Sequence, residues 1–285
     1  MRNSRIPTII LALAAASCLL TGCGGSAAGG SAPTPAPTPV VSPSPAPSPT
    51  PVPSPSPTPT PPAPNNTVID NVQNSPNWLT CGACGNTGGT GAIAQATFSP
   101  GITAPSEDLI ATQFNIAPPS AFANAYFYRQ QTPVTSQINA LTYEFDLYIP
   151  SGMETAPQAI EFECQQIIGG WVYNFGWQAP YHGATTWRIF DYGLKRWDAT
   201  PVPVQPFSPG TWHHIVAEYH DDTANHLVIH DALTVDGVRF PVNITHDAFF
   251  SGGRNQFTNA VQLDSNSSST PYTIYVDKMK ITYQQ

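Results

Sequence analysis

The chain has 285 residues, with 18 acidic and 10 basic side chains and a formal net charge of −8 at pH 7. This excess of acidic groups argues against nucleic acids and other polyanions as partners, and it is compatible with neutral glycans or with cations. Prolines are concentrated in one segment near the N-terminus, so only the remainder of the chain can form a core.

Residues 1–22 have the pattern of an export signal. Arg2 and Arg5 precede an apolar run that is too short to span a bilayer comfortably. The run ends in LTGC at positions 20–23, which resembles the bacterial lipobox, where a peptidase cuts before the cysteine and its thiol receives lipid. The resemblance implies an exported lipoprotein that is anchored in a bacterial membrane through Cys23 and displayed at the cell envelope surface. An ordinary signal peptide with an incidental cysteine is the alternative.

Residues 23–64 are expected to form a stalk. Proline alternates with small and polar residues from 31 to 64, and proline fixes φ and removes a backbone donor, so an extended polyproline-like spacer of about 100 Å is predicted. Recognition of the PxxP pattern by a partner is the alternative reading of this segment.

Residues 65–285 are predicted to be one all-β domain, because alternating apolar and polar residues recur between turn residues and no window has a sustained helical period. Asp236-Gly237 is a hairpin signal. The pattern indicates an antiparallel two-sheet sandwich, which we expect to be monomeric. Strands are expected within 140–150, 159–166, 171–178, 186–193, 211–220, 226–237 and 272–283.

The segment AIEFECQQ, residues 159–166, alternates strictly. On a strand, Ile160, Phe162 and Cys164 point to one face and should meet the core. Glu161 and Glu163 then point to the other face, towards solvent or a cleft, as does Gln165.

The order of these motifs resembles the concanavalin A-like lectin/glucanase superfamily, most of all the jelly-roll domains of exported acidobacterial proteins. The segments that carry the resemblance are AIEFECQQ, WRIFDYG, GTWHHIVAEYHDD, ALTVDG and IYVDKMKITY. The resemblance covers about residues 68–285 and implies a jelly roll whose concave sheet carries a carbohydrate groove. Members of the superfamily range from lectins to glycanases and lyases.

Retaining glucanases of this superfamily use a strand motif Glu-x-Asp-x-x-Glu. Mapped onto this chain, Glu161 takes the place of the nucleophile, Glu163 that of the central Asp, and Gln166 that of the acid/base. A glutamine cannot donate and recover a proton, so the two-carboxylate mechanism fails at that position. A glycoside hydrolase that uses Glu161 and Glu163 as its pair remains an alternative.

A polysaccharide lyase is a further alternative, with His182 as base and Arg188 to neutralise a uronate. His213, His214 and His220 are spare candidates for the base. We favour glycan binding over either enzyme, because aromatic faces stack on sugar rings while carboxylates and amides bond to hydroxyls. The candidate carbohydrate-binding residues are Glu161, Glu163, Gln165, Trp177, His182 and Arg188.

Three cysteines lie in the predicted domain. Cys81 and Cys84 form a CxxC, which is expected to be a local disulfide rather than a redox motif or half of a zinc site. Cys164 should stay reduced on the core face of its strand. No cofactor is predicted, although a calcium ion is compatible with Asp221-Asp222 or with Asp264.

The lipobox generates the first testable prediction. Cys23→Ser should abolish partitioning into a detergent phase, because the thiol that would carry the lipid is gone, and it should leave soluble or uncleaved chain. Phase separation of cell extracts followed by immunoblotting checks this. An unchanged detergent-phase fraction would contradict the lipoprotein reading.

Overall fold

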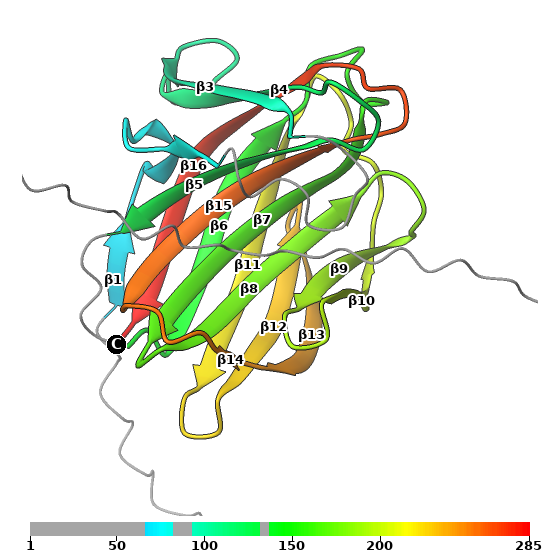
Figure 1. The fold of residues 1–285 in the computed structure, drawn as a ribbon. Coiled ribbons are helices and arrows are strands. Elements are labelled where there is room, and N and C mark those ends of the chain that lie inside the picture. The colour runs from blue at the N-terminus through cyan, green and yellow to red at the C-terminus, as the bar shows by residue number, and fades with distance from the viewer. Residues whose placement is uncertain (1–65, 82–92, 132–136) are drawn as a thin grey trace, which may run out of the picture. The chain divides into compact units, whose positions relative to one another are not determined.

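The computed structural model describes residues 66–81, 93–131 and 137–285. These residues form two antiparallel sheets stacked face to face in a jelly-roll sandwich (Figure 1), which confirms the predicted fold class. The predicted signal peptide, residues 1–22, and the predicted stalk, residues 23–64, lie outside the described residues and stay predictions. The predicted domain boundary at residue 65 also lies outside the described residues and stays a prediction.

The first sheet has eight strands, in the order β13-β12-β11-β6-β16-β4-β3, with β1 paired to β16. Their bounds are β1 Asn66–Ile69, β3 Gln95–Ile102, β4 Ala111–Ala117, β6 Ala140–Tyr148, β11 Trp212–Asp222, β12 Leu227–Val235, β13 Val238–Asp247 and β16 Tyr272–Gln284.

The second sheet also has eight strands, in the order β10-β9-β8-β7-β15-β5-β2, with β14 paired to β8. Their bounds are β2 Leu79–Thr80, β5 Asn124–Gln131, β7 Pro157–Ile168, β8 Trp171–Pro180, β9 Thr186–Asp191, β10 Arg196–Pro203, β14 Phe249–Phe250 and β15 Gln256–Ser265. In the described part of the chain, the only helical element is the short 3-10 turn η1, Val72–Asn74, and no helix there is long and apolar enough to cross a membrane.

Two tight turns set strand register. The pair Gly169-Gly170 joins β7 to β8 with positive φ at both residues (57° and 86°), and Asp236-Gly237 joins β12 to β13 in the same way (50° and 80°). Two-residue turns of this kind match the twist of a hairpin. The first turn therefore places Trp177 directly opposite Phe162 across the two strands.

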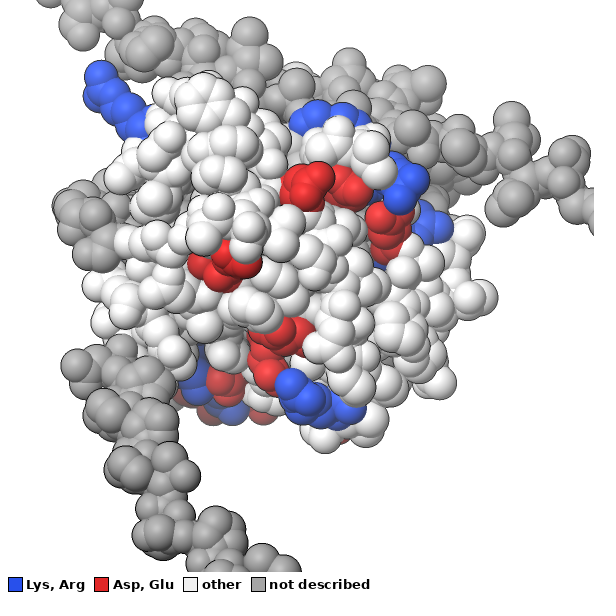
Figure 2. All heavy atoms as spheres, turned by 90° about the horizontal axis from the view of Figure 1, so that it is seen from below, with Lys and Arg blue, Asp and Glu red and all other residues white. Residues whose placement is uncertain are grey.

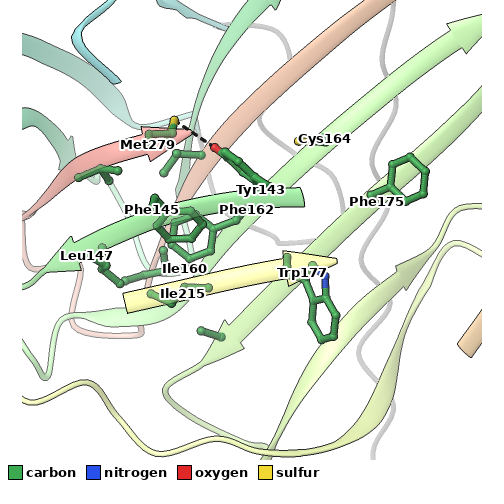
Figure 3. Close-up of a cluster of buried hydrophobic side chains, with 14 of the residues drawn as sticks. Tyr143, Phe145, Leu147, Ile160, Phe162, Cys164, Phe175, Trp177, Ile215 and Met279 are labelled. Atoms are coloured by element: carbon green, nitrogen blue, oxygen red, sulfur yellow. Dashed lines mark hydrogen bonds between the residues drawn. The ribbon is translucent and has the colours of Figure 1, made fainter. Parts of the chain in front are cut away.

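The core lies between the sheets and is rich in aromatic residues (Figure 3). The rings of Phe145, from the first sheet, and Phe162, from the second, have centroids 4.2 Å apart. The Tyr143 hydroxyl donates to Met279 Sδ at 3.4 Å. Cys164 is buried and free, as the sequence predicted. The inner row of β7 therefore holds the two layers together.

The position of Phe162 generates a stability prediction. Phe162→Ala should lower the free energy of unfolding by roughly 3–5 kcal/mol, because it opens a cavity between the sheets. Phe250→Ala is the matched control, since the Phe250 side chain is 64% exposed and its removal should cost less than about 1 kcal/mol. Chemical denaturation of both variants measures the difference, and equal losses would show that β7 does not face the core as described.

Candidate functional site

Strand β7 presents two carboxyl groups on the face of the second sheet that points away from the core. Ile160, Phe162 and Cys164 belong to the buried apolar cluster between the sheets, so Glu161 and Glu163 lie on the opposite face. The pairing of β7 with both of its neighbours is regular from Ile160 to Gln166. This is the face assignment that the sequence predicted.

Strand registers identify the other residues on this surface, because directly paired residues share a face. We call this surface the polar face. It comprises Tyr126 and Tyr128 from β5, Thr258, Ala260, Gln262 and Asp264 from β15, Glu161, Glu163 and Gln165 from β7, Asn174, Gly176 and Gln178 from β8, and Arg188 and Phe190 from β9.

Both carboxyl groups of β7 are buried, whereas the sequence predicted a row facing solvent or a cleft. Glu161 and Glu163 are each 2% exposed. Gln178 Nε2 donates to Glu161 Oε1 at 2.8 Å, and the Tyr126 hydroxyl donates to Glu163 Oε2 at 3.3 Å. Of the remaining oxygens, Glu163 Oε1 is buried without a hydrogen-bond partner. Glu161 Oε2 is also buried, but the Glu161 carboxyl group shares a hydrogen bond with Asp264 when one of the two is protonated. Since buried acceptors are normally paired, Glu163 Oε1 is an uncompensated acceptor, and it is inaccessible to solvent in this structure.

Two unpartnered donors accompany this acceptor. Gln165 Nε2 donates to Asn174 Oδ1 at 3.3 Å, and this leaves Asn174 Nδ2 buried without a partner. The hydroxyl of Thr258, which pairs with Gln165 from the other side, is also buried and unpartnered. The polar face therefore holds both an unpartnered acceptor and unpartnered donors.

A third carboxyl group, Asp264 on β15, lies beside Glu161. Asp264 Oδ1 accepts from Gln262 Nε2 at 3.0 Å, and its carboxylate contributes to raising the pKa of Glu161. The sequence suggested Asp264 only as a calcium ligand. Its role here depends on the register between β15 and β7, which joins segments far apart in the chain.

Burial raises the pKa of all three carboxyl groups, because a carboxylate loses its hydration inside the protein. The pKa of Glu161 lies well above its usual value, first through burial and then through the charges of Asp264 and Glu163. Burial raises the pKa of Glu163 to about 7, although the Tyr126 hydrogen bond opposes the shift. Burial also raises the pKa of Asp264 to about 6. Near neutral pH, part of this acidic group therefore holds protons and can donate.

Small residues flank Glu163 across the sheet, and aromatic residues end the row. Ala260 and Gly176 are its two direct partners. On one side, Tyr128 pairs with Ala260. On the other side, Phe190 is next to Gly176: a Cβ atom added to this glycine would lie 3.5 Å from Phe190 Cβ. Neither direct neighbour therefore places a large side chain over Glu163, while an aromatic residue stands beyond each.

A small apolar cluster adjoins this row, formed by Phe190, Tyr192, Trp197 and Phe249. The rings of Tyr192 and Phe249 stack with centroids 4.4 Å apart. Burial, and then the nearby charge of Glu163, raise the pKa of Tyr192. The cluster thus brings a phenol close to the central carboxyl group.

Two residues discussed in the sequence lie on the wrong face for this site. Trp177 is 1% exposed and packs in the core against Trp187, so we correct the candidate set by leaving Trp177 out. Gln166 also points inward, where it bonds to both backbone groups of Ile138 and donates to Asp221 Oδ2 at 2.7 Å. Gln166 therefore cannot act on a molecule bound beside Glu161.

The histidine candidates are also elsewhere. His182 is exposed in the turn after β8, where its carbonyl oxygen accepts from Gln158. His213, His214 and His220 belong to β11 of the first sheet and bond to aspartates. Arg188, by contrast, pairs with Gln178 and lies at the margin of the polar face.

The remaining candidates concern cysteines and calcium. Cys23 and Cys84 lie outside the described residues, and Cys81 is disulfide-bonded. Asp221 bonds to Gln166, and Asp222 bonds to Asn225. In the ranges that the structure describes, neither these aspartates nor Asp264 belongs to a group of three metal-ligand side chains.

The charge at the surface is mixed. On the face of the described residues seen in Figure 2, uncharged side chains cover most of the area, and acidic and basic groups lie close together. This view shows no broad basic area of the kind that binds polyanions.

Comparison with known proteins identifies no family. No protein-family model matches the sequence, and no curated protein matches it. The chain is similar in structure to the Emp46p carbohydrate recognition domain (14% identity, 66% of this chain and 87% of that chain, TM-score 0.37). It is also similar to lectin UEA-II complexed with galactose (8%, 76% and 98%, TM-score 0.41) and to the cellulose-induced protein Cip1 (8%, 72% and 90%, TM-score 0.44). At these identities and TM-scores the similarities carry no argument about function.

The raised pKa of Glu163 generates a pH prediction. Below the usual carboxyl value of 4.5 both folded and unfolded chains hold the proton; as the pH rises towards 7 only the unfolded chain ionises, so stability is lost. The loss from this group is about 3 kcal/mol at most, and Glu161 and Asp264 add to it with the same sign. Glu163→Gln should therefore make the free energy of unfolding less sensitive to pH between 5 and 8.

Denaturant titrations at both pH values measure this effect. Asp70→Asn, an exposed carboxyl-to-amide change, is the matched control and should leave the pH dependence unaltered. A Glu163→Gln variant that loses as much stability as the parent between pH 5 and 8 would show that Glu163 ionises normally.

Proposed function

We propose that the polar face of the second sheet binds a polysaccharide or other glycan. The observation that supports this proposal is the set of three buried atoms without partners: the acceptor Glu163 Oε1 and the donors Asn174 Nδ2 and Thr258 Oγ1. A sugar hydroxyl both donates and accepts, so hydroxyls can satisfy the acceptor on Glu163 and the two donors beside Gln165 once the side chains that cover these atoms move.

The composition of the face supports a neutral or weakly charged glycan. Its charged residues are three carboxyl groups with raised pKa values and Arg188 at the margin. A polyanion would be repelled by any carboxylate that ionises. Tyr128 and Phe190 stand at the two ends of the Glu163 row, and aromatic rings pack well on the apolar faces of sugars.

The proposal extends to how the domain is displayed. The sequence predicts a lipid at Cys23 and an extended stalk over residues 23–64, and a stalk of this kind holds a binding domain away from the membrane surface. In this reading the chain is a monomeric surface lipoprotein of a bacterial cell envelope that captures glycan.

A glycoside hydrolase is the second candidate, and one observation favours it. Burial gives Glu163 a pKa of about 7, which suits a general acid at neutral pH. However, Gln166 stands where the retaining glucanases carry their acid/base, and it points into the core, so the second carboxyl group of the mechanism is missing. Binding therefore remains the first proposal.

The unpartnered hydroxyl of Thr258 gives the sharpest test of binding. Thr258→Val keeps the shape of the side chain and breaks no hydrogen bond within the protein, so stability should hold, while glycan affinity should fall about fivefold or more through loss of one hydrogen bond. A glycan array on residues 65–285, followed by calorimetry with the best ligand, measures this. Thr282→Val on β16 of the first sheet is the matched control and should bind normally.

The same glycans separate the two candidates. Under the binding proposal no reducing ends appear on prolonged incubation, and Glu163→Gln changes affinity only modestly. Under the hydrolase alternative the parent releases reducing ends, and Glu163→Gln removes turnover by orders of magnitude while binding survives. Absence of any bound glycan on the array, or equal affinity for Thr258→Val and the parent, would overturn the binding proposal.

A further inference from the structure

Three metal-ligand side chains meet at one edge of the sandwich, on the inner side of β9 and β10 and not on the polar face. Asp191 ends β9, Asp198 lies in β10, and His246 lies near the end of β13. One ligand atom from each lies within 4.8 Å of the other two. Strands β9 and β10 belong to the second sheet and β13 to the first, so this edge cluster joins the two sheets.

The strand registers explain why these side chains point at one another. Asp198 pairs with Ile189, which belongs to the core, and His246 pairs with Val228, which does so too. Since paired residues share a face, Asp198 and His246 both point into the space between the sheets. β10 and β13 are in contact at this edge.

His246 provides a second, independent sign of a ligand. His246 is 8% exposed, and neither of its ring nitrogens has a hydrogen-bond partner. Nε2 lies 3.4 Å from Asp198 Oδ2, but the pair does not satisfy hydrogen-bond geometry. A buried imidazole without partners is costly, and its nitrogen here is aimed at the carboxylates.

We propose that Asp191, Asp198 and His246 bind a divalent transition-metal ion of the zinc type. Two ligands of a tetrahedral zinc ion, each about 2.0–2.1 Å from it, stand about 3.3 Å apart, which matches the separation of His246 Nε2 and Asp198 Oδ2. A neutral imidazole with carboxylates suits zinc and its neighbours in the first transition row, whereas calcium takes oxygen ligands alone. Three protein ligands leave a fourth position for water.

The charged and polar groups around the edge cluster are compatible with a bound cation. Arg196 contacts both oxygens of Asp198, with Nε 2.7 Å from Oδ1 and Nη2 donating to Oδ2 at 3.3 Å. The Arg196 side chain is 56% exposed, so the guanidinium can turn into solvent and release Oδ2 when a cation binds. Asp191 Oδ1 accepts from the Leu194 backbone at 2.9 Å, an ordinary second partner for a ligating carboxylate. An ion at this position would clamp the open edges of the two sheets together.

The test uses the mature chain after removal of metal with a chelator. Calorimetry with Zn²⁺ should show one site per chain, and Co²⁺ should give the visible absorption of a tetrahedral ion with a nitrogen ligand. The melting temperature should rise by about 5–10 °C when free Zn²⁺ exceeds Kd a hundredfold. His246→Gln and Asp198→Asn should each weaken binding by about a hundredfold or more, since even supporting residues of metal sites cost 10–100-fold.

His220→Gln is the matched control, because His220 also pairs with an aspartate, Asp231 at 2.8 Å, outside the edge cluster. It should bind Zn²⁺ as the parent does. Failure of the parent to bind Zn²⁺ or Co²⁺, or binding that His246→Gln and Asp198→Asn leave intact, overturns the proposal and leaves an ordinary ion pair at this edge. If a variant does not fold, paramagnetic shifts of the His246 ring protons in the Co²⁺-loaded parent decide the matter: shifted protons support the site and unshifted protons refute it.

Discussion

The structure depends on the period of two along β7, because this strand is buried on both faces. Its inner row, Ile160, Phe162 and Cys164, packs in the core, and its outer row carries Glu161 and Glu163, which are as little exposed as core residues. A shift of register by one residue would exchange the rows and place carboxyl groups between the sheets. The apolar row therefore fixes where the acidic row must lie. Burial of the acidic row disfavours the charged carboxylates, and this raises their pKa values.

This cost favours a functional reading of the polar face. Buried carboxyl groups with unpaired oxygens reduce stability unless they are protonated or bound. Strongly shifted pKa values cluster at functional sites in folded proteins. The partial neutralisation of Glu161, Glu163 and Asp264 near neutral pH also suits an uncharged partner better than a cation.

Much of the fold could be predicted from the sequence. Alternation gave the strands and the inward direction of Phe162, and Asp236-Gly237 gave a hairpin turn that the structure contains. The burial of Glu161 could not be predicted, since a period of two says which face a side chain takes and not what packs against that face.

The site was harder to assign because it depends on register. Trp177 was expected on the glycan surface, yet the two-residue turn Gly169-Gly170 pairs it with Phe162 in the core. That turn was visible in the sequence and could have corrected the assignment. Asp264 beside Glu161, and the meeting of Asp191 with His246, arise from sheet pairing and packing between distant segments, which no local pattern encodes.

We propose that the outer row of β7 carries carboxyl groups that hold protons near neutral pH and hydrogen-bond to a glycan. Carbon-13 NMR of the glutamate side-chain carboxyls, followed against pH and assigned with Glu163→Gln, measures this directly. Glu163 should titrate near pH 7, and its resonance should move when an oligosaccharide that the domain binds is added. Titration at the usual carboxyl value of 4.5, with a resonance that the oligosaccharide leaves in place, would contradict it.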